Sequence, residues 1–112
     1  MSLAEVLAEL REGAYERERE HTLLFEQVAA VKQTGFGALR VPAQFGGSDA
    51  SLAEVFDQLI QIAAADSNVA HVWRGHIAFV EGIRRASPER AERWFARLGA
   101  GELVGNAQSE QH

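Results

Sequence analysis

The pattern of hydrophobic and polar positions predicts five helices. Apolar residues recur at steps of three and four along residues 3–20, 22–32 and 69–85, which is the spacing of one helical face. Residues 52–65 are apolar around most of a helical circumference, so this helix is expected to lie centrally. Residues 88–98 form the fifth predicted helix, which Gly99 ends. We therefore expect an all-α bundle of about five helices.

Serine residues stand at the expected starts of four helices. Ser2 and Ser51 each precede a glutamate by three positions, the spacing of a capping box in which side chains satisfy free amides of the first turn. Ser67 is the expected N-cap of the fourth helix. Ser87 precedes a proline, which is favoured at the first helical position because its missing N–H would have no partner there.

Two segments do not fit a helix. Residues 35–51 contain four glycines and Pro42, which disfavours the α conformation at Val41, so they are expected to form a shaped connector. Residues 103–112 follow a turn and are predicted to begin a β-strand, a C-terminal strand stub. An isolated strand cannot satisfy its own backbone groups and needs a pairing partner.

The composition is that of a soluble globular domain. The 112 residues are 46% hydrophobic and 24% charged, with a formal net charge of -5, so nucleic acid and anionic membrane are not expected partners. The absence of cysteine excludes disulfides and thiolate metal sites. The sequence has no secretory signal pattern and no apolar run of about 20 residues, which makes the cytoplasm the expected location.

The stretch HVWRGH, residues 71–76, holds two histidines on one predicted helix. They lie about 140° apart around the axis, so they do not converge on one metal ion and no metal site is expected. His71 shares its side with small residues that would let another helix approach, namely Gly75, Ala78 and Gly82. His76 lies in the apolar stripe with Trp73, either as a core histidine bonded to a backbone carbonyl or as the lining of a ligand cavity.

Charged residues elsewhere are expected to face water. These are the alternating run YEREREH at residues 15–21 and, on the fourth helix, Arg74, Glu81 and Arg85. No serine, histidine and acid have a spacing that indicates a nucleophilic triad, and Gly46 and Gly47 do not belong to a phosphate-binding loop.

The order of several motifs resembles a known family. They are G-x-x-x-L-x-V-P-x-x-F-G-G at residues 35–47, A-A-A-D at residues 63–66, the histidine helix, and G-N-A-x-S-E at residues 105–110. In this order and spacing, over nearly the whole chain, they resemble the N-terminal helical domain of the acyl-CoA dehydrogenase fold. The two histidines and Gln111, where dehydrogenases usually carry a proline, are closer to its monooxygenase branch, which includes dibenzothiophene monooxygenase and the sulfur-acquisition oxidoreductases.

The resemblance implies a domain organisation and a cofactor. Residues 1–102 would be the N-terminal helical domain, and residues 103–112 would begin a middle β-domain. Members bind FMN or FAD between these domains, and the monooxygenases take reduced flavin from a separate reductase. The expected activity is oxygenation of a small organosulfur or aromatic substrate by a homo-oligomeric enzyme. The chain alone, lacking the later domains, is expected to be inactive and not to bind flavin.

The resemblance also assigns site residues. Asn106 and Ser109 would contact the flavin. His76 would project toward the flavin and the substrate as the catalytic residue, donating a hydrogen bond in a dry site. Trp73 and Phe79 would form the wall of the substrate pocket. Two alternatives stay open: an acyl-CoA dehydrogenase N-terminal domain, whose chemistry needs a glutamate base further along the chain, and a free-standing helical module that dimerises through its apolar faces.

Overall fold

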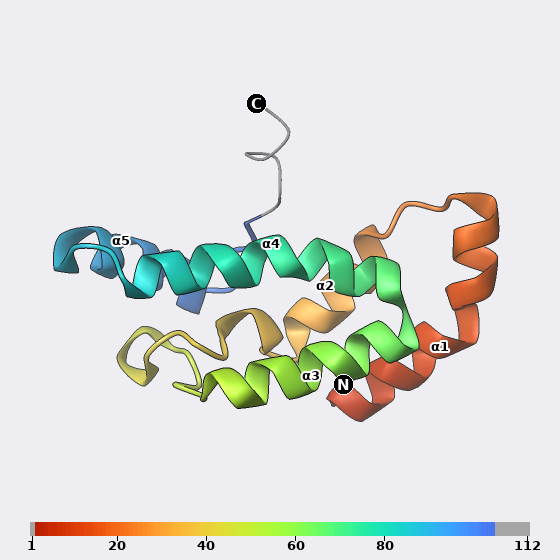
Figure 1. Ribbon diagram of the computed structural model, residues 1–112, viewed down its shortest axis with the longest axis horizontal. Coiled ribbons are helices and arrows are strands. Elements are labelled where there is room, and N and C mark those ends of the chain that lie inside the picture. Colours follow the sequence, from red (N-terminus) through yellow and green to blue (C-terminus); the bar gives the residue numbers. More distant parts are fainter. Residues whose placement is uncertain (1, 105–112) are drawn as a thin grey trace.

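The computed structural model describes residues 2–104, and its regular elements are all helical. The α-helices are α1 (Leu3–Glu20), α2 (Phe25–Gln33), α3 (Leu52–Ala65), α4 (Ser67–Arg84) and α5 (Pro88–Gly99). Two 3₁₀ turns, η1 (Phe36–Ala38) and η2 (Ala43–Phe45), shape the connector between α2 and α3. The antiparallel helices α3 and α4 lie side by side, with α1 toward one end of the molecule and α5 toward the other (Figure 1).

The all-α prediction is thus confirmed for the described residues. Leu103 and Val104 are assigned to no helix or strand, and the rest of the predicted strand lies outside the described residues. The proposed domain boundary after residue 102 stays a prediction.

Side-chain caps begin three of the helices as predicted. At Ser2 the capping box is complete, because its hydroxyl accepts from the Glu5 amide and the Glu5 carboxylate accepts from the Ser2 amide. At Ser51 only the hydroxyl half forms, and Ser87 caps α5. The prediction that Ser67 caps α4 was wrong. Asp66 holds that position, and its Oδ1 accepts from the first amides of the helix.

Helix α2 begins at Phe25, three residues later than the sequence predicts. The reason lies at the end of α1, where His21 adopts a left-handed conformation with φ 54°. The Thr22 amide then donates to the carbonyl of Arg17, so these residues close α1 and do not start the next helix.

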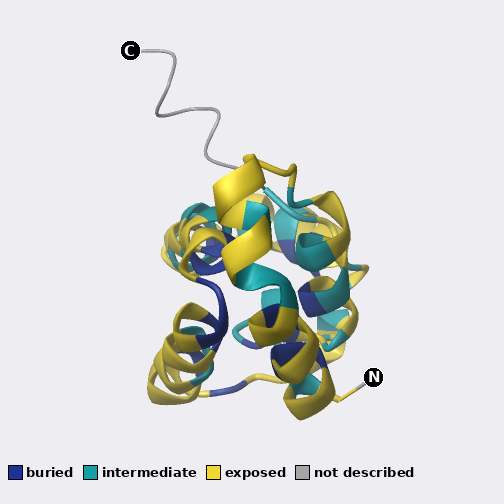
Figure 2. Ribbon diagram, turned by 90° about the vertical axis from the view of Figure 1, so that its right-hand side faces the viewer, coloured by how far each residue is buried: buried dark blue, intermediate teal, exposed yellow. Residues whose placement is uncertain are grey.

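Two hydrophobic clusters form the core. The larger one joins α1, α2, α3 and the first half of α4, and its buried members include Trp73, Ile62, Phe36, Leu10 and Val69. The smaller one joins the end of α4, α5 and the connector through Val41, Val80, Ile83, Phe95 and Leu98. Figure 2 places the buried residues on the inward sides of the helices.

The predicted central position of α3 was wrong. Only one face of this helix is covered, the face that carries Val55, Ile62 and Ala65. On the other side Phe56 is 49% exposed and Ile60 68% exposed, since α1 and α4 are the helices that pack against α3. The apolar surplus of α3 therefore forms an open surface.

Candidate functional site

His76 sits inside the bundle, with 1% of its surface exposed. Its Nε2 lies 2.7 Å from the carbonyl oxygen of Gly37 in η1, and its Nδ1 accepts a hydrogen bond from the amide of Val104 at 3.0 Å. Burial lowers the pKa of His76 below its usual value, and the bond to Gly37 partly opposes this effect. The ring is therefore a neutral core histidine that links the connector to the end of the described chain.

Of the other predicted site residues, Trp73 packs against the His76 ring, whereas Phe79 packs against Trp94. Trp73 is fully buried, and its ring makes edge contacts with Phe36 at 5.4 Å and with His76 at 5.2 Å between centroids. Phe79 instead packs edge-on against Trp94 at 4.7 Å, on the side of α4 that faces α5. Trp73 and Phe79, which were predicted to line one pocket, thus pack in different hydrophobic clusters.

The predicted flavin contacts, Asn106 and Ser109, lie outside the described residues. Their role stays a prediction, as do the catalytic role of His76 and the pocket roles of Trp73 and Phe79.

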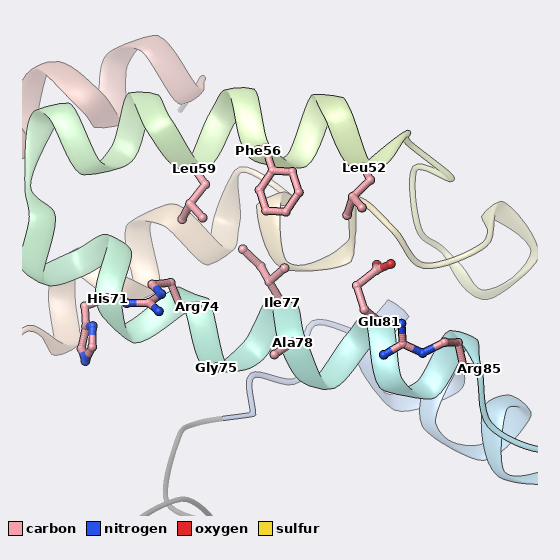
Figure 3. Close-up of a pocket in the computed structure, with 10 residues that line it drawn as sticks. All are labelled: Leu52, Phe56, Leu59, His71, Arg74, Gly75, Ile77, Ala78, Glu81 and Arg85. Atoms are coloured by element: carbon pink, nitrogen blue, oxygen red, sulfur yellow. The ribbon is translucent and has the colours of Figure 1, made fainter.

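A groove of about 600 Å³ runs between α3 and α4, a volume in the range of ligand sites. Figure 3 shows its two walls: apolar side chains of α3 face one side of α4. The lining residues are Leu52, Phe56, Leu59, His71, Arg74, Gly75, Ile77, Ala78, Glu81 and Arg85. The floor is therefore apolar, while cationic and titratable groups of α4 stand along its length.

The small-residue side of α4 gives this groove its depth. Gly75 and Ala78 have little side chain to fill the space, and His71 is exposed near one end. The sequence predicted that another helix approaches the small residues of α4. It did not predict that apolar residues of α3 line the other wall of a groove there. The available signal was the excess of apolar residues on α3.

At the other end of the groove, Glu81 is bound to Arg40 of the connector. Both oxygens of the carboxylate accept from the guanidinium, at 2.8 and 2.9 Å, and Arg40 also donates to the carbonyl of Ala50. This pairing lowers the pKa of Glu81 and raises that of Arg40. The expectation that Glu81 simply faces water was wrong, because its partner lies 41 residues earlier in the chain.

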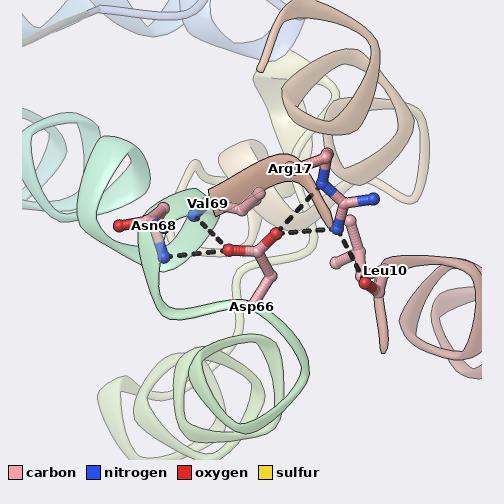
Figure 4. Close-up of polar contacts among 5 residues, drawn as sticks. All are labelled: Leu10, Arg17, Asp66, Asn68 and Val69. Carbon is pink, nitrogen blue, oxygen red and sulfur yellow. Dashed lines mark hydrogen bonds and ion pairs between the residues drawn. The ribbon is translucent and has the colours of Figure 1, made fainter. Parts of the chain in front are cut away.

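A second ion pair fixes the corner between α3 and α4. The guanidinium of Arg17 donates to Asp66 Oδ2 from Nη2 at 2.7 Å and from Nε at 3.3 Å, and to the carbonyl of Leu10 (Figure 4). The side chains are 13% and 4% exposed. Arg17 belongs to the charged run that was predicted to face water throughout, so that prediction was wrong at this position.

Residues 2–104 offer no cluster of three or more histidine, cysteine or acidic side chains able to hold a metal ion. Within the same residues, no helix combines the length and apolar character needed to cross a membrane.

Comparison with known proteins places this arrangement in a family. Residues 3–102 match the family described as acyl-CoA dehydrogenase, N-terminal domain, so the chain belongs to that family. The resemblance inferred from the motifs is thereby confirmed. The chain is also similar to the "Probable FMNH2-dependent monooxygenase SfnC" of Pseudomonas putida, with 31% identity over 80 residues. That match covers 70% of this chain and 20% of the relative, so the chain spans about a fifth of that protein's length.

Proposed function

We propose that this chain is the N-terminal helical part of a reduced-flavin monooxygenase that oxygenates a small organosulfur or aromatic compound. The observation that carries the proposal is the 31% identity to a protein named as an FMNH2-dependent monooxygenase, within a family match that covers residues 3–102. The overall reaction would consume reduced flavin, O₂ and substrate, and yield oxidised flavin, oxygenated product and water. A separate flavin reductase would supply the reduced cofactor.

The chemistry of the chain's residues fits a flavin held mainly beyond the described bundle. His76 has both ring nitrogens bonded to backbone, and the large groove carries its charged groups on a single helix. The amide of Asn106 and the hydroxyl of Ser109 follow Val104 closely and suit hydrogen bonds to the edge of a flavin ring. When bound, the flavin would supply the redox chemistry. The helical bundle would fix the backbone just before the residues that contact the flavin.

The test uses the complete coding region that contains these residues. Its product, supplied with NADH, FMN and a flavin reductase, is expected to transfer one atom of isotopically labelled O₂ to thioanisole or dibenzothiophene. The control omits the reductase. Oxidation of butyryl-CoA with an artificial electron acceptor, without oxygen transfer to either sulfide, would instead support the dehydrogenase alternative.

A second measurement concerns the 112-residue chain alone. Titration with FMN and with FAD, followed by flavin fluorescence, is expected to detect no binding at micromolar concentrations. Micromolar affinity would contradict the inference that further polypeptide completes the site.

A further inference from the structure

His76 joins two segments that are far apart in the sequence. Gly37 precedes it by 39 residues and Val104 follows it by 28, and the imidazole is hydrogen-bonded to the backbone of both. We propose that His76 is a positioning residue, which fixes the backbone of Val104 and thereby the start of the segment carrying Asn106 and Ser109. The link from His76 to Val104 is independent of the proposed function, and only the binding of flavin by that segment rests on it.

The two partners determine the protonation of the ring. An amide N–H only donates, so Nδ1 opposite Val104 must be the unprotonated acceptor. A carbonyl oxygen only accepts, so Nε2 opposite Gly37 must carry the hydrogen. A protonated imidazolium would have no acceptor for Val104, so the link exists in one tautomer of the neutral ring.

The surroundings hold the ring in this orientation. Trp73 packs against it edge-on at an interplanar angle of 85°. On the opposite element, a Cβ at Gly37 would lie 2.8 Å from Trp73 Cζ3 and 3.1 Å from His76 Nε2. A side chain at position 37 would therefore push the carbonyl away from the imidazole, and glycine allows the close approach.

The hydrogen bond acts on a segment whose side chains contact both clusters. Leu103 packs against the larger hydrophobic cluster, and Val104 against the smaller one that includes Phe95 and Leu98. The Val104 amide is thus anchored where the two clusters meet. With neither nitrogen free, His76 would have to release Gly37 or Val104 before it bonded to a cofactor or substrate.

Two amide variants separate the two bonds of the ring. The side-chain nitrogen of glutamine reaches the place of Nε2, so His76→Gln keeps a donor for Gly37 and removes the acceptor for Val104. The oxygen of asparagine reaches the place of Nδ1, so His76→Asn keeps the acceptor and loses the donor. Hydrogen exchange measured by NMR is expected to accelerate about fivefold at the Val104 amide in His76→Gln, the factor that corresponds to one hydrogen bond, and to change little in His76→Asn. Equal exchange of Val104 in both variants would overturn the proposal.

A measurement on the unmodified chain covers the case in which the variants do not fold. Scalar coupling between the Val104 amide nitrogen and His76 Nδ1 is expected, and its absence would refute the link.

In the product of the complete coding region, His76→Gln is expected to raise the Kd for FMN by up to about fivefold, the worth of one hydrogen bond, while His76→Asn retains the wild-type Kd. A catalytic histidine would instead make both variants lose kcat with the Kd unchanged, and that result would overturn the positioning role. Retained coupling in a protein that binds neither FMN nor FAD would leave the link standing and refute the proposed flavin function.

Discussion

The Asp66 to Arg17 pair is predicted to carry much of the stability of the α3 to α4 corner. In Asp66→Asn the Oδ1 cap of α4 can remain, because asparagine is an equally good N-cap, but a neutral amide replaces the oxygen that faces Arg17. Removing one partner of a buried ion pair costs about 3–5 kcal/mol. Arg17 keeps its bond to Leu10 and is 13% exposed, so we expect the lower end, about 3 kcal/mol.

This loss is measurable without unfolding the chain, since domains of this size have stabilities of about 5–15 kcal/mol. It corresponds to a fall in Tm of roughly 12–24 °C. Urea unfolding followed by circular dichroism gives the free energies for four variants. Asp66→Ala should lose about 1 kcal/mol more than Asp66→Asn because the cap is lost as well. Arg17→Met combined with Asp66→Asn should restore roughly 1–3 kcal/mol relative to the sum of the single changes. Simple additivity, or a loss below about 1 kcal/mol in Asp66→Asn, would refute the reasoning.

Three further predictions concern glycine packing, pH and association. A Cβ at Gly99 would lie 1.6 Å from the Phe45 carbonyl oxygen, whereas a Cβ at Gly82 would have no neighbouring atom within 4 Å. Thermal unfolding should therefore show Gly99→Ala destabilised by about 1–3 kcal/mol and Gly82→Ala stabilised by about 0.5–1 kcal/mol. Unchanged stability in Gly99→Ala would contradict the close approach of α5 to the connector. Because the folded pKa of His76 lies below its unfolded value of about 6.5, its stabilising contribution is complete above pH 6.5 and is lost as the pH falls from there toward the folded pKa. The charged groups beside His76, Arg40 and Glu81, are paired with each other. Between pH 7.5 and 5.5 the urea midpoint should therefore fall more steeply in wild type than in His76→Gln. An equal dependence of the midpoint on pH in the two proteins would refute this. Light scattering is expected to detect self-association through the exposed face of α3, to lose it in Phe56→Glu combined with Ile60→Glu, and to retain it in the control Gln61→Glu; an unchanged mass in the double variant would exclude this face.

Local signals were sufficient to predict most of the helices. The cap at Ser2 and the start of α5 at Pro88 depend on residues within one helical turn, and both appear as expected. The cap of α4 was mistaken because Asp66 and Ser67 are both good N-cap residues. What decides between them is Arg17, which is 49 residues away and pairs with the aspartate that caps.

The position of a helix in the bundle is less accessible to sequence reasoning. Periodicity identified the apolar residues of α3 but not which of them a neighbour covers. The whole helix was therefore expected to lie centrally, whereas Phe56 and Ile60 are exposed. The candidate site was affected in the same way. The apolar stripe of α4 correctly placed His76 inside, but its partners, Gly37 and Val104, come from segments without any periodic pattern.

The motif most diagnostic of the family serves packing, not chemistry, in the described structure. In residues 35–47 the Gly37 carbonyl receives the His76 hydrogen bond, and a Cβ at Gly47 would lie 2.0 Å from the Val41 carbonyl oxygen. The first approach joins the connector to α4, and the second folds the connector back on itself. Membership of the family therefore follows from residues that build the bundle, whereas dehydrogenation and oxygenation can share this same bundle. The choice between them depends on the groups that meet the substrate, and the His76 link to Val104 is where the described bundle would influence them.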